Sequence, residues 1–143
     1  MDEPAVGNYF VSAYPPFSCW TPEGLEAYRR VLTQPAGKAH RELGLYVHIP
    51  FCVQRCQYCY YLAYDGRMKE MERYLAAATR ELELYREMPA LAGRDLSFVY
   101  FGGGTPSLLS ATRLRGFLDG LQRVAAWDRV REATFEYGAY PIK

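Results

Sequence analysis

The fold is decided by one stretch of sequence, LGLYVHIPFCVQRCQYC (residues 43–59). Its first seven residues, 43–49, are mostly apolar, aromatic or β-branched, and Pro50 ends the run, so they predict a buried strand. The loop that follows, residues 50–61, carries three of the four cysteines of the chain. The sequence therefore predicts a buried strand that leads directly into a cysteine-rich loop.

The segments after this loop alternate between helix and strand patterns. Apolar residues recur every three or four positions over residues 67–88, which predicts an amphipathic helix. Residues 96–101 are expected to form a second buried strand that a glycine run breaks, Ser110 to cap a second helix, and residues 133–137 to form a third strand. The order β–α–β–α–β is typical of a parallel sheet, so we predict an α/β fold.

The first forty residues have the pattern of an extension. Pro15 and Pro16 exclude a regular helix around them, whereas Thr21 is expected to cap a short helix that ends before Pro35. We therefore divide the chain into an N-terminal extension, residues 1–40, and a core domain, residues 41–143.

Length and composition limit the classes of protein. The chain has 143 residues, half of them hydrophobic, which suffices for one domain. A complete α/β barrel needs about 250 residues. The net charge of +1 argues against a nucleic-acid surface. No apolar run approaches the ~18 residues of a membrane span, and the N-terminus has no secretory signal pattern. We therefore expect neither nucleic acid nor a membrane as a partner.

The cysteine spacing is the strongest chemical signal. Cys52, Cys56 and Cys59 form a C-x3-C-x2-C pattern, in which three thiolates could each bind one iron of a four-iron cluster and leave the fourth iron open. A zinc site with His48 as the fourth ligand is the alternative, and Cys19 has no predicted ligand role. Clustered thiols without a secretory signal indicate a reducing compartment, so we expect the chain in the cytoplasm.

Two motifs together resemble the radical S-adenosylmethionine superfamily, and within it the oxygen-independent coproporphyrinogen III oxidase-like branch. They are YVHIPFC (residues 46–52), which leads into the cysteine loop, and GGGTPS (residues 102–107) after the next strand. The resemblance covers residues 43–137. It implies that the core domain is the N-terminal portion, about three β/α units, of a partial TIM-type (β/α)6 barrel. We expect that domain to be truncated at its C-terminus or completed by another polypeptide.

The resemblance implies two cofactors. A [4Fe–4S] cluster would be bound by Cys52, Cys56 and Cys59, and S-adenosylmethionine would bind the open iron. In this family the reduced cluster cleaves S-adenosylmethionine to a 5′-deoxyadenosyl radical, which abstracts hydrogen from a substrate. The implied partners are a small-molecule substrate such as a tetrapyrrole and an electron donor such as flavodoxin or ferredoxin. Catalytic residues stay unassigned.

The resemblance also implies which residues contact the second cofactor. They are Tyr46, Tyr58, Gly102, Gly103, Gly104, Thr105 and Glu136. The glycines and the threonine would meet the methionyl end, where a residue without a Cβ lets the backbone come close to a ligand. The Glu136 carboxylate would accept a hydrogen bond from the ammonium group, Tyr58 would lie beside the adenine, and Tyr46 would lie near the cluster. His48 has either a functional or a structural role.

Two positions depart from the family's pattern. Tyr61 stands where coproporphyrinogen oxidases usually have a further cysteine, and the stretch after Glu136 differs from the family's shorter pattern. Because the expected barrel is incomplete, a non-catalytic module that binds a cluster or haem is an alternative, and a zinc-stabilised interaction module is another.

Overall fold

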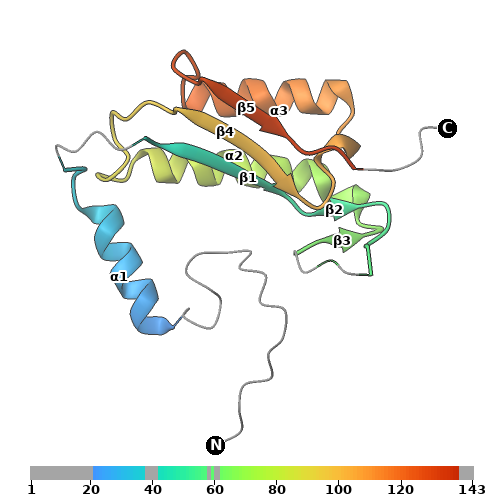
Figure 1. Cartoon of the computed structure of the whole chain (residues 1–143), viewed down its shortest axis with the longest axis horizontal. Coiled ribbons are helices and arrows are strands. Elements are labelled where there is room, and N and C mark those ends of the chain that lie inside the picture. Colours follow the sequence, from blue (N-terminus) through green and yellow to red (C-terminus); the bar gives the residue numbers. More distant parts are fainter. Residues whose placement is uncertain (1–20, 38–41, 58, 60–61, 139–143) are drawn as a thin grey trace, which may run out of the picture.

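The computed structural model describes residues 21–37, 42–57, 59 and 62–138. In chain order its elements are α1 (Pro22–Thr33), β1 (Gly44–Ile49), β2 (Phe51–Cys52), β3 (Tyr64–Asp65), the 3-10 turn η2 (Met68–Glu70), α2 (Met71–Arg86), β4 (Phe98–Gly103), the 3-10 turn η3 (Pro106–Leu108), α3 (Ala111–Val124) and β5 (Glu132–Phe135). Figure 1 shows their arrangement.

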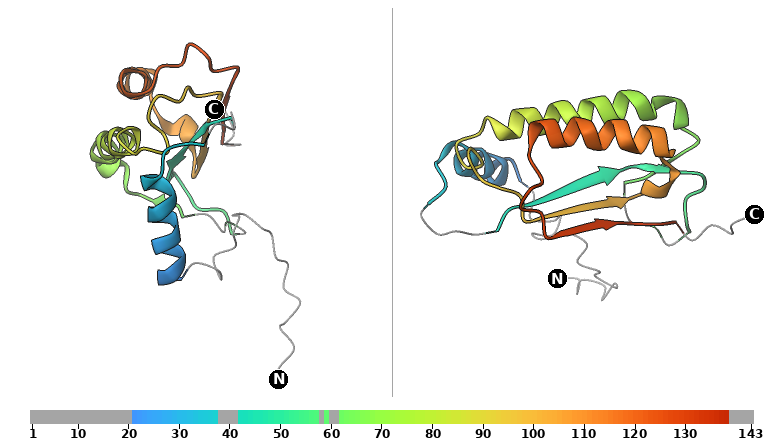
Figure 2. Two further views of the ribbon diagram at one scale, coloured as in Figure 1. Left: turned by 90° about the vertical axis from the view of Figure 1, so that its left-hand side faces the viewer. Right: turned by 90° about the horizontal axis from the view of Figure 1, so that it is seen from above.

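The main sheet has three parallel strands in the order β1-β4-β5, which is also their order in the sequence. Helices α2 and α3 lie side by side over one face of that sheet (Figure 2). A parallel sheet with its helices in the crossovers is the predicted α/β arrangement, and the predicted fold class is confirmed. The three strands form an open sheet rather than a closed barrel.

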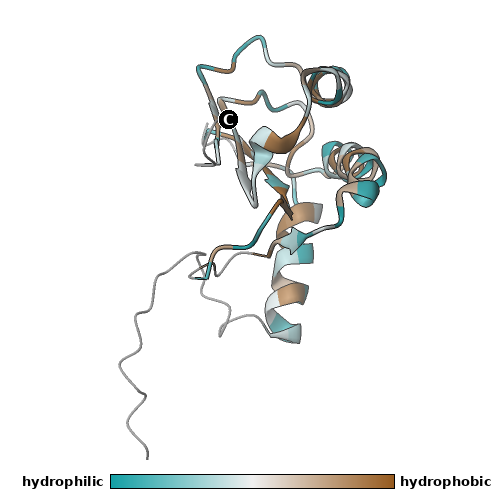
Figure 3. Ribbon diagram, turned by 90° about the vertical axis from the view of Figure 1, so that its right-hand side faces the viewer, coloured by the Kyte–Doolittle hydropathy of each residue, from teal (hydrophilic) through white to brown (hydrophobic). Residues whose placement is uncertain are grey.

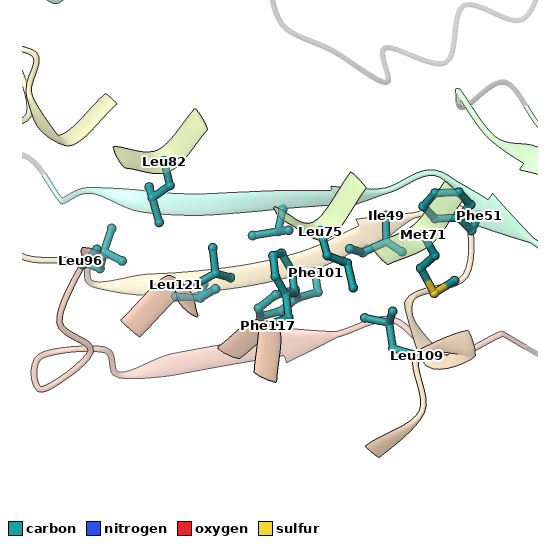
Figure 4. Packing of buried hydrophobic residues seen from close by; sticks show 13 residues of the cluster. Ile49, Phe51, Met71, Leu75, Leu82, Leu96, Phe101, Leu109, Phe117 and Leu121 are labelled. Atoms are coloured by element: carbon teal, nitrogen blue, oxygen red, sulfur yellow. The ribbon is translucent and has the colours of Figure 1, made fainter. Parts of the chain in front are cut away.

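Alternation along the strands produces the two faces of the sheet. Val47, Ile49, Val99 and Phe101 are buried, and they belong to one hydrophobic cluster with Leu75, Leu82, Phe117 and Leu121 of the two helices (Figure 4). Neighbouring residues on a strand point to opposite faces. Tyr46, His48 and Tyr100 are therefore on the face that α2 and α3 do not cover.

The helix boundaries follow local capping chemistry. The Thr21 side chain accepts a hydrogen bond from the Gly24 N–H (3.2 Å), and the Ser110 side chain accepts one from the Arg113 N–H (3.3 Å). Both predicted caps are confirmed, and α1 ends at Thr33, before Pro35. The helix predicted over 67–88 is shorter, because η2 precedes α2 and the α-helical bonding ends at Arg86.

Helix α1 lies apart from the core. None of its residues is buried, and its apolar positions appear as brown bands on the ribbon in Figure 3. It is joined to the rest by the Ala90 N–H, which donates to the Leu32 carbonyl (3.1 Å), and by the Tyr28 and Tyr85 hydroxyls (3.4 Å). The division of the chain at residue 40 stays a prediction. No helix in the described ranges is both long and apolar enough to cross a bilayer.

The end of β4 differs from the prediction. The glycine run was expected to break the strand after Phe101, but β4 continues through Gly103, because Gly102 and Gly103 are paired with His48 and Ile49 of β1. Gly104 extends this contact, since its N–H donates to the Ile49 carbonyl (2.8 Å). The chain therefore turns only after the glycines have paired with the neighbouring strand.

We predict that the Gly104→Ala substitution lowers the free energy of unfolding by about 2 kcal/mol, within the range for overpacking. An added Cβ would lie 2.8 Å from the Ile49 and Phe51 carbonyl oxygens, which are backbone atoms and cannot move aside. The matched control is Gly116→Ala in α3, where a Cβ would meet nothing within 4 Å. This helical substitution should raise the free energy of unfolding by about 0.5–1 kcal/mol. Urea denaturation measures both, and an unchanged stability of Gly104→Ala would contradict the packing.

Candidate functional site

The base of the cysteine loop is closed by a second, small sheet. The chain passes from β1 through Pro50 into β2, and β2 pairs with β3, which follows the loop. The Tyr64 N–H also donates to the Pro50 carbonyl (2.7 Å). Sequence reasoning did not predict β2 and β3, since a two-residue strand has no periodicity to detect. Together they make the loop leave and return at the carboxyl end of β1.

The three predicted ligands differ in exposure along this loop. Cys52 is buried in β2, Cys56 is exposed and Cys59 is half-buried, and all three are free thiols. The Cys59 N–H donates to the Cys56 carbonyl (3.1 Å), and the Arg55 guanidinium donates to the Cys59 carbonyl (3.1 Å). Arg55 was not among the predicted site residues, although its position between clustered cysteines in the sequence could have indicated it. It places a positive group at the backbone of Cys59.

The glycine turn, residues 102–105 at the end of β4, lies directly against the start of the cysteine loop. The Thr105 N–H donates to the Phe51 carbonyl (2.8 Å), and the Thr105 hydroxyl donates to the Cys52 sulfur (3.5 Å). Thr105 is only 4% exposed, so both contacts are shielded from water. The structure therefore brings together the two motifs that are about fifty residues apart in the sequence.

Because the glycines of this turn have no Cβ, other side chains of the protein pack into that space. Gly103 has φ +109°, and a Cβ there would lie 2.5 Å from the His48 ring. A Cβ at Gly102 would lie 3.1 Å from the Glu136 carboxylate. We expected the glycines to let a ligand approach, and the structure shows that they first let His48 and Glu136 approach.

Glu136 follows β5 at the carboxyl end of the sheet and is held by two donors. The Tyr100 hydroxyl donates to Oε1 (2.6 Å), and the Gly103 N–H donates to Oε2 (3.1 Å). The Glu136 N–H continues the ladder by donating to the Phe101 carbonyl (3.0 Å). Tyr100 was missed by sequence reasoning, although its position two residues before Gly102 places it on the same face of the sheet.

Tyr46 and His48 lie on the open face beside Tyr100. The Tyr46 ring is stacked on the Tyr100 ring, with centroids 5.8 Å apart, and Tyr46 is 53% exposed. The Tyr46 hydroxyl lies 3.1 Å from His48 Nδ1, and His48 Nε2 lies 2.7 Å from the Leu62 carbonyl. Tyr58 and Cys19 lie outside the described residues, so the predictions for them have no structural counterpart.

The donor set fits an iron–sulfur cluster in its chemistry. Three free thiols lie on one loop, and the strands at its two ends, β2 and β3, pair with each other. Over the described residues, the side chains do not gather three or more His, Cys, Asp or Glu groups in a geometry ready for a metal ion. Metal binding commonly supplies the energy that draws such ligands together.

Comparisons with known proteins agree on one group. No family model matches the chain. The chain is 35% identical to the heme chaperone HemW of Escherichia coli over 82 residues, and 42% identical to HemW of Mycobacterium tuberculosis over 79 residues. These matches cover 56% and 53% of the chain. A radical S-adenosyl methionine domain-containing protein 1, mitochondrial, of Danio rerio is 26% identical over 122 residues, 85% of the chain.

The chain spans only a part of these relatives: 21%, 20% and 27% of their lengths. Among solved structures, coproporphyrinogen III oxidase (HemN) from Escherichia coli, a radical SAM enzyme, matches with a TM-score of 0.62 and 27% identity. That match covers 82% of this chain and 26% of the enzyme. The sequence and structure comparisons thus confirm the resemblance first drawn from the cysteine loop and the glycine run, which is to the coproporphyrinogen III oxidase-like branch of the radical S-adenosylmethionine superfamily.

Proposed function

We propose that this chain binds a [4Fe–4S] cluster through Cys52, Cys56 and Cys59, and S-adenosylmethionine at the adjoining glycine turn. One observation carries the proposal: the Thr105 hydroxyl contacts the Cys52 sulfur, so the cysteine loop and the glycine turn form one site. Ligands of parallel α/β folds bind at the carboxyl ends of the strands, where both motifs lie. A reducing compartment such as the cytoplasm keeps the thiols available for iron.

The cofactors and the protein have separate tasks. When bound and reduced, the cluster and S-adenosylmethionine supply a 5′-deoxyadenosyl radical for hydrogen abstraction. Three cysteine thiolates serve three of the four irons, which leaves one iron open to the second cofactor. The chain's own residues bind, orient and shield the reacting groups. The family resemblance supports this division of tasks.

Glu136 is the proposed acceptor for the ammonium group of S-adenosylmethionine. Its carboxylate lies at the end of the sheet and already accepts hydrogen bonds from Tyr100 and Gly103. A carboxylate has about four lone-pair sites, so two donors leave capacity for an ammonium group. Tyr100 and Gly103 would therefore fix the orientation of the acceptor before the cofactor binds.

The function of the whole protein has two candidates. The first is hydrogen abstraction from a small-molecule substrate such as a tetrapyrrole, with flavodoxin or ferredoxin as the electron donor. The second is a non-catalytic module that binds a cluster or haem. The names of the HemW relatives favour it. Tyr61, which stands where coproporphyrinogen oxidases usually have a further cysteine, argues only against a porphyrin-specific activity. A zinc module using His48 is less favoured, because both ring nitrogens of His48 already have hydrogen-bond partners.

Anaerobic reconstitution with iron and sulfide should load the chain with about four irons and give the brown colour of a [4Fe–4S] protein. Cys52→Ser, Cys56→Ser and Cys59→Ser should each lose most of that iron, since each removes one thiolate. Cys19→Ser is the matched control and should retain it. Equal iron in all four variants would refute the assignment of ligands, and zinc without iron and sulfide would favour the zinc module.

Reduction of the loaded chain with dithionite in the presence of S-adenosylmethionine separates the first two candidates. The enzyme candidate predicts 5′-deoxyadenosine and methionine in equal amounts, measured by chromatography. Stoichiometric haem binding without 5′-deoxyadenosine, with the cluster intact, would instead support the haem-binding module and refute cleavage by this chain.

Tyr100→Phe should raise the Kd of the loaded chain for S-adenosylmethionine about five- to tenfold. It removes one charge-assisted hydrogen bond from Glu136 and keeps the aromatic ring that is stacked on Tyr46. The matched control is Tyr137→Phe, because Tyr137 is 70% exposed and its loss of a hydroxyl should change the Kd less than about twofold. Calorimetric titration measures both, and an unchanged Kd in Tyr100→Phe would contradict the role of Glu136.

A further inference from the structure

His48 connects several parts of the candidate site. It is the fifth residue of β1 and lies half-buried on the open face of the sheet. Its ring nitrogens reach Tyr46 on the same strand and Leu62 at the end of the cysteine loop. Its ring also fills the space that a Cβ at Gly103 would need.

The two hydrogen-bond partners of the His48 ring define its tautomer. The Leu62 carbonyl can only accept, so Nε2 must carry the hydrogen and donate to it across 2.7 Å. In the neutral ring Nδ1 is then an acceptor, and it receives the Tyr46 hydroxyl at 3.1 Å. One tautomer therefore satisfies both partners. The bond to Leu62 spans fourteen residues of sequence, and Leu62 is three residues from Cys59.

The main chain of His48 is held from the other side of the sheet. The Tyr74 hydroxyl of α2 donates to the His48 carbonyl (2.7 Å), and the Tyr74 ring packs edge-on against Phe51 at 5.4 Å. Burial is the main cause that raises the pKa of Tyr74, so this phenol stays a donor at neutral pH. The imidazole thus stands on a fixed backbone, and it can hold the loop in a defined place.

We propose that His48 is a positioning residue, whose Nε2–H holds the returning end of the cysteine loop and thereby keeps Cys59 within reach of Cys52. This proposal rests on the proposed cluster site. It assigns His48 neither to the metal nor to the substrate. It also gives a reason for glycine at position 103, because the ring that ties the loop occupies the place of a side chain there.

Two substitutions separate the two hydrogen bonds of the ring. The amide nitrogen of glutamine reaches about the position of histidine Nε2, so His48→Gln keeps a donor for the Leu62 carbonyl. Asparagine is one methylene shorter and reaches only the position of Nδ1, so His48→Asn keeps the Tyr46 contact and loses the Leu62 contact. Both variants lose the ring, and urea denaturation controls for the one methylene by which their packing over Gly103 differs.

The first readout is the exchange rate of the Cys59 amide in the cluster-free chain, measured by NMR. This amide donates to the Cys56 carbonyl inside the loop. In His48→Asn the Cys59 amide should exchange about fivefold faster than in the unsubstituted chain, because the loss of one net hydrogen bond changes a rate by roughly fivefold. In His48→Gln its exchange rate should stay within about twofold of that of the unsubstituted chain. The second readout is iron release from the loaded chain to a chelator, with the same order of rates. Urea denaturation of both variants checks that the global fold is equally stable.

Rescue by glutamine and failure of asparagine in both readouts would support the proposal. It would be overturned if asparagine matched the unsubstituted chain, or if glutamine and asparagine were equally impaired, since the ring and not the hydrogen bond would then matter. A chain that takes up no iron at all would refute the proposed function. The exchange rates of the cluster-free variants would still decide whether His48 holds the loop.

Discussion

The close approach of Gly104 to the junction of β1 and β2 is the constraint on which the candidate site depends. Its N–H donates to the Ile49 carbonyl, the next N–H donates to the Phe51 carbonyl, and backbone atoms fill the space where a Cβ would be. Pro50 ends β1 at this point, so the chain enters the cysteine loop directly beside the glycine turn. The contact between Thr105 and Cys52 follows from this arrangement.

The order of strands and helices could be predicted from the sequence, because apolar periodicity, Pro50 and the capping residues Thr21 and Ser110 act locally. The extent of β4 could not, since Gly102 and Gly103 have low intrinsic strand preference and become strand residues only by pairing with β1. The same limit applies to the small sheet of β2 and β3. Tertiary pairing decides these elements.

Only part of the site could be predicted from the sequence, for a similar reason. The cysteine spacing is contiguous in sequence, so the candidate ligands could be named at once. The carboxylate of Glu136 and its donor Tyr100 are brought together by neighbouring strands, and only the register of β4 and β5 places them side by side. The sequence does not decide between a structural and a functional role for His48, because the path of the loop brings its partner Leu62 to it. In the proposed function, the cofactor meets the sheet on the open face that carries Tyr46, Tyr100 and Glu136.

The central claim is that the cysteine loop and the glycine turn form one site for a cluster and S-adenosylmethionine. Low-temperature electron paramagnetic resonance of the reduced, reconstituted chain tests it most directly. Because the proposed ligand set leaves the fourth iron without a thiolate, addition of S-adenosylmethionine should shift the g values of the [4Fe–4S]⁺ signal, and Glu136→Ala should weaken that response. A signal that saturating S-adenosylmethionine leaves unchanged would contradict the claim.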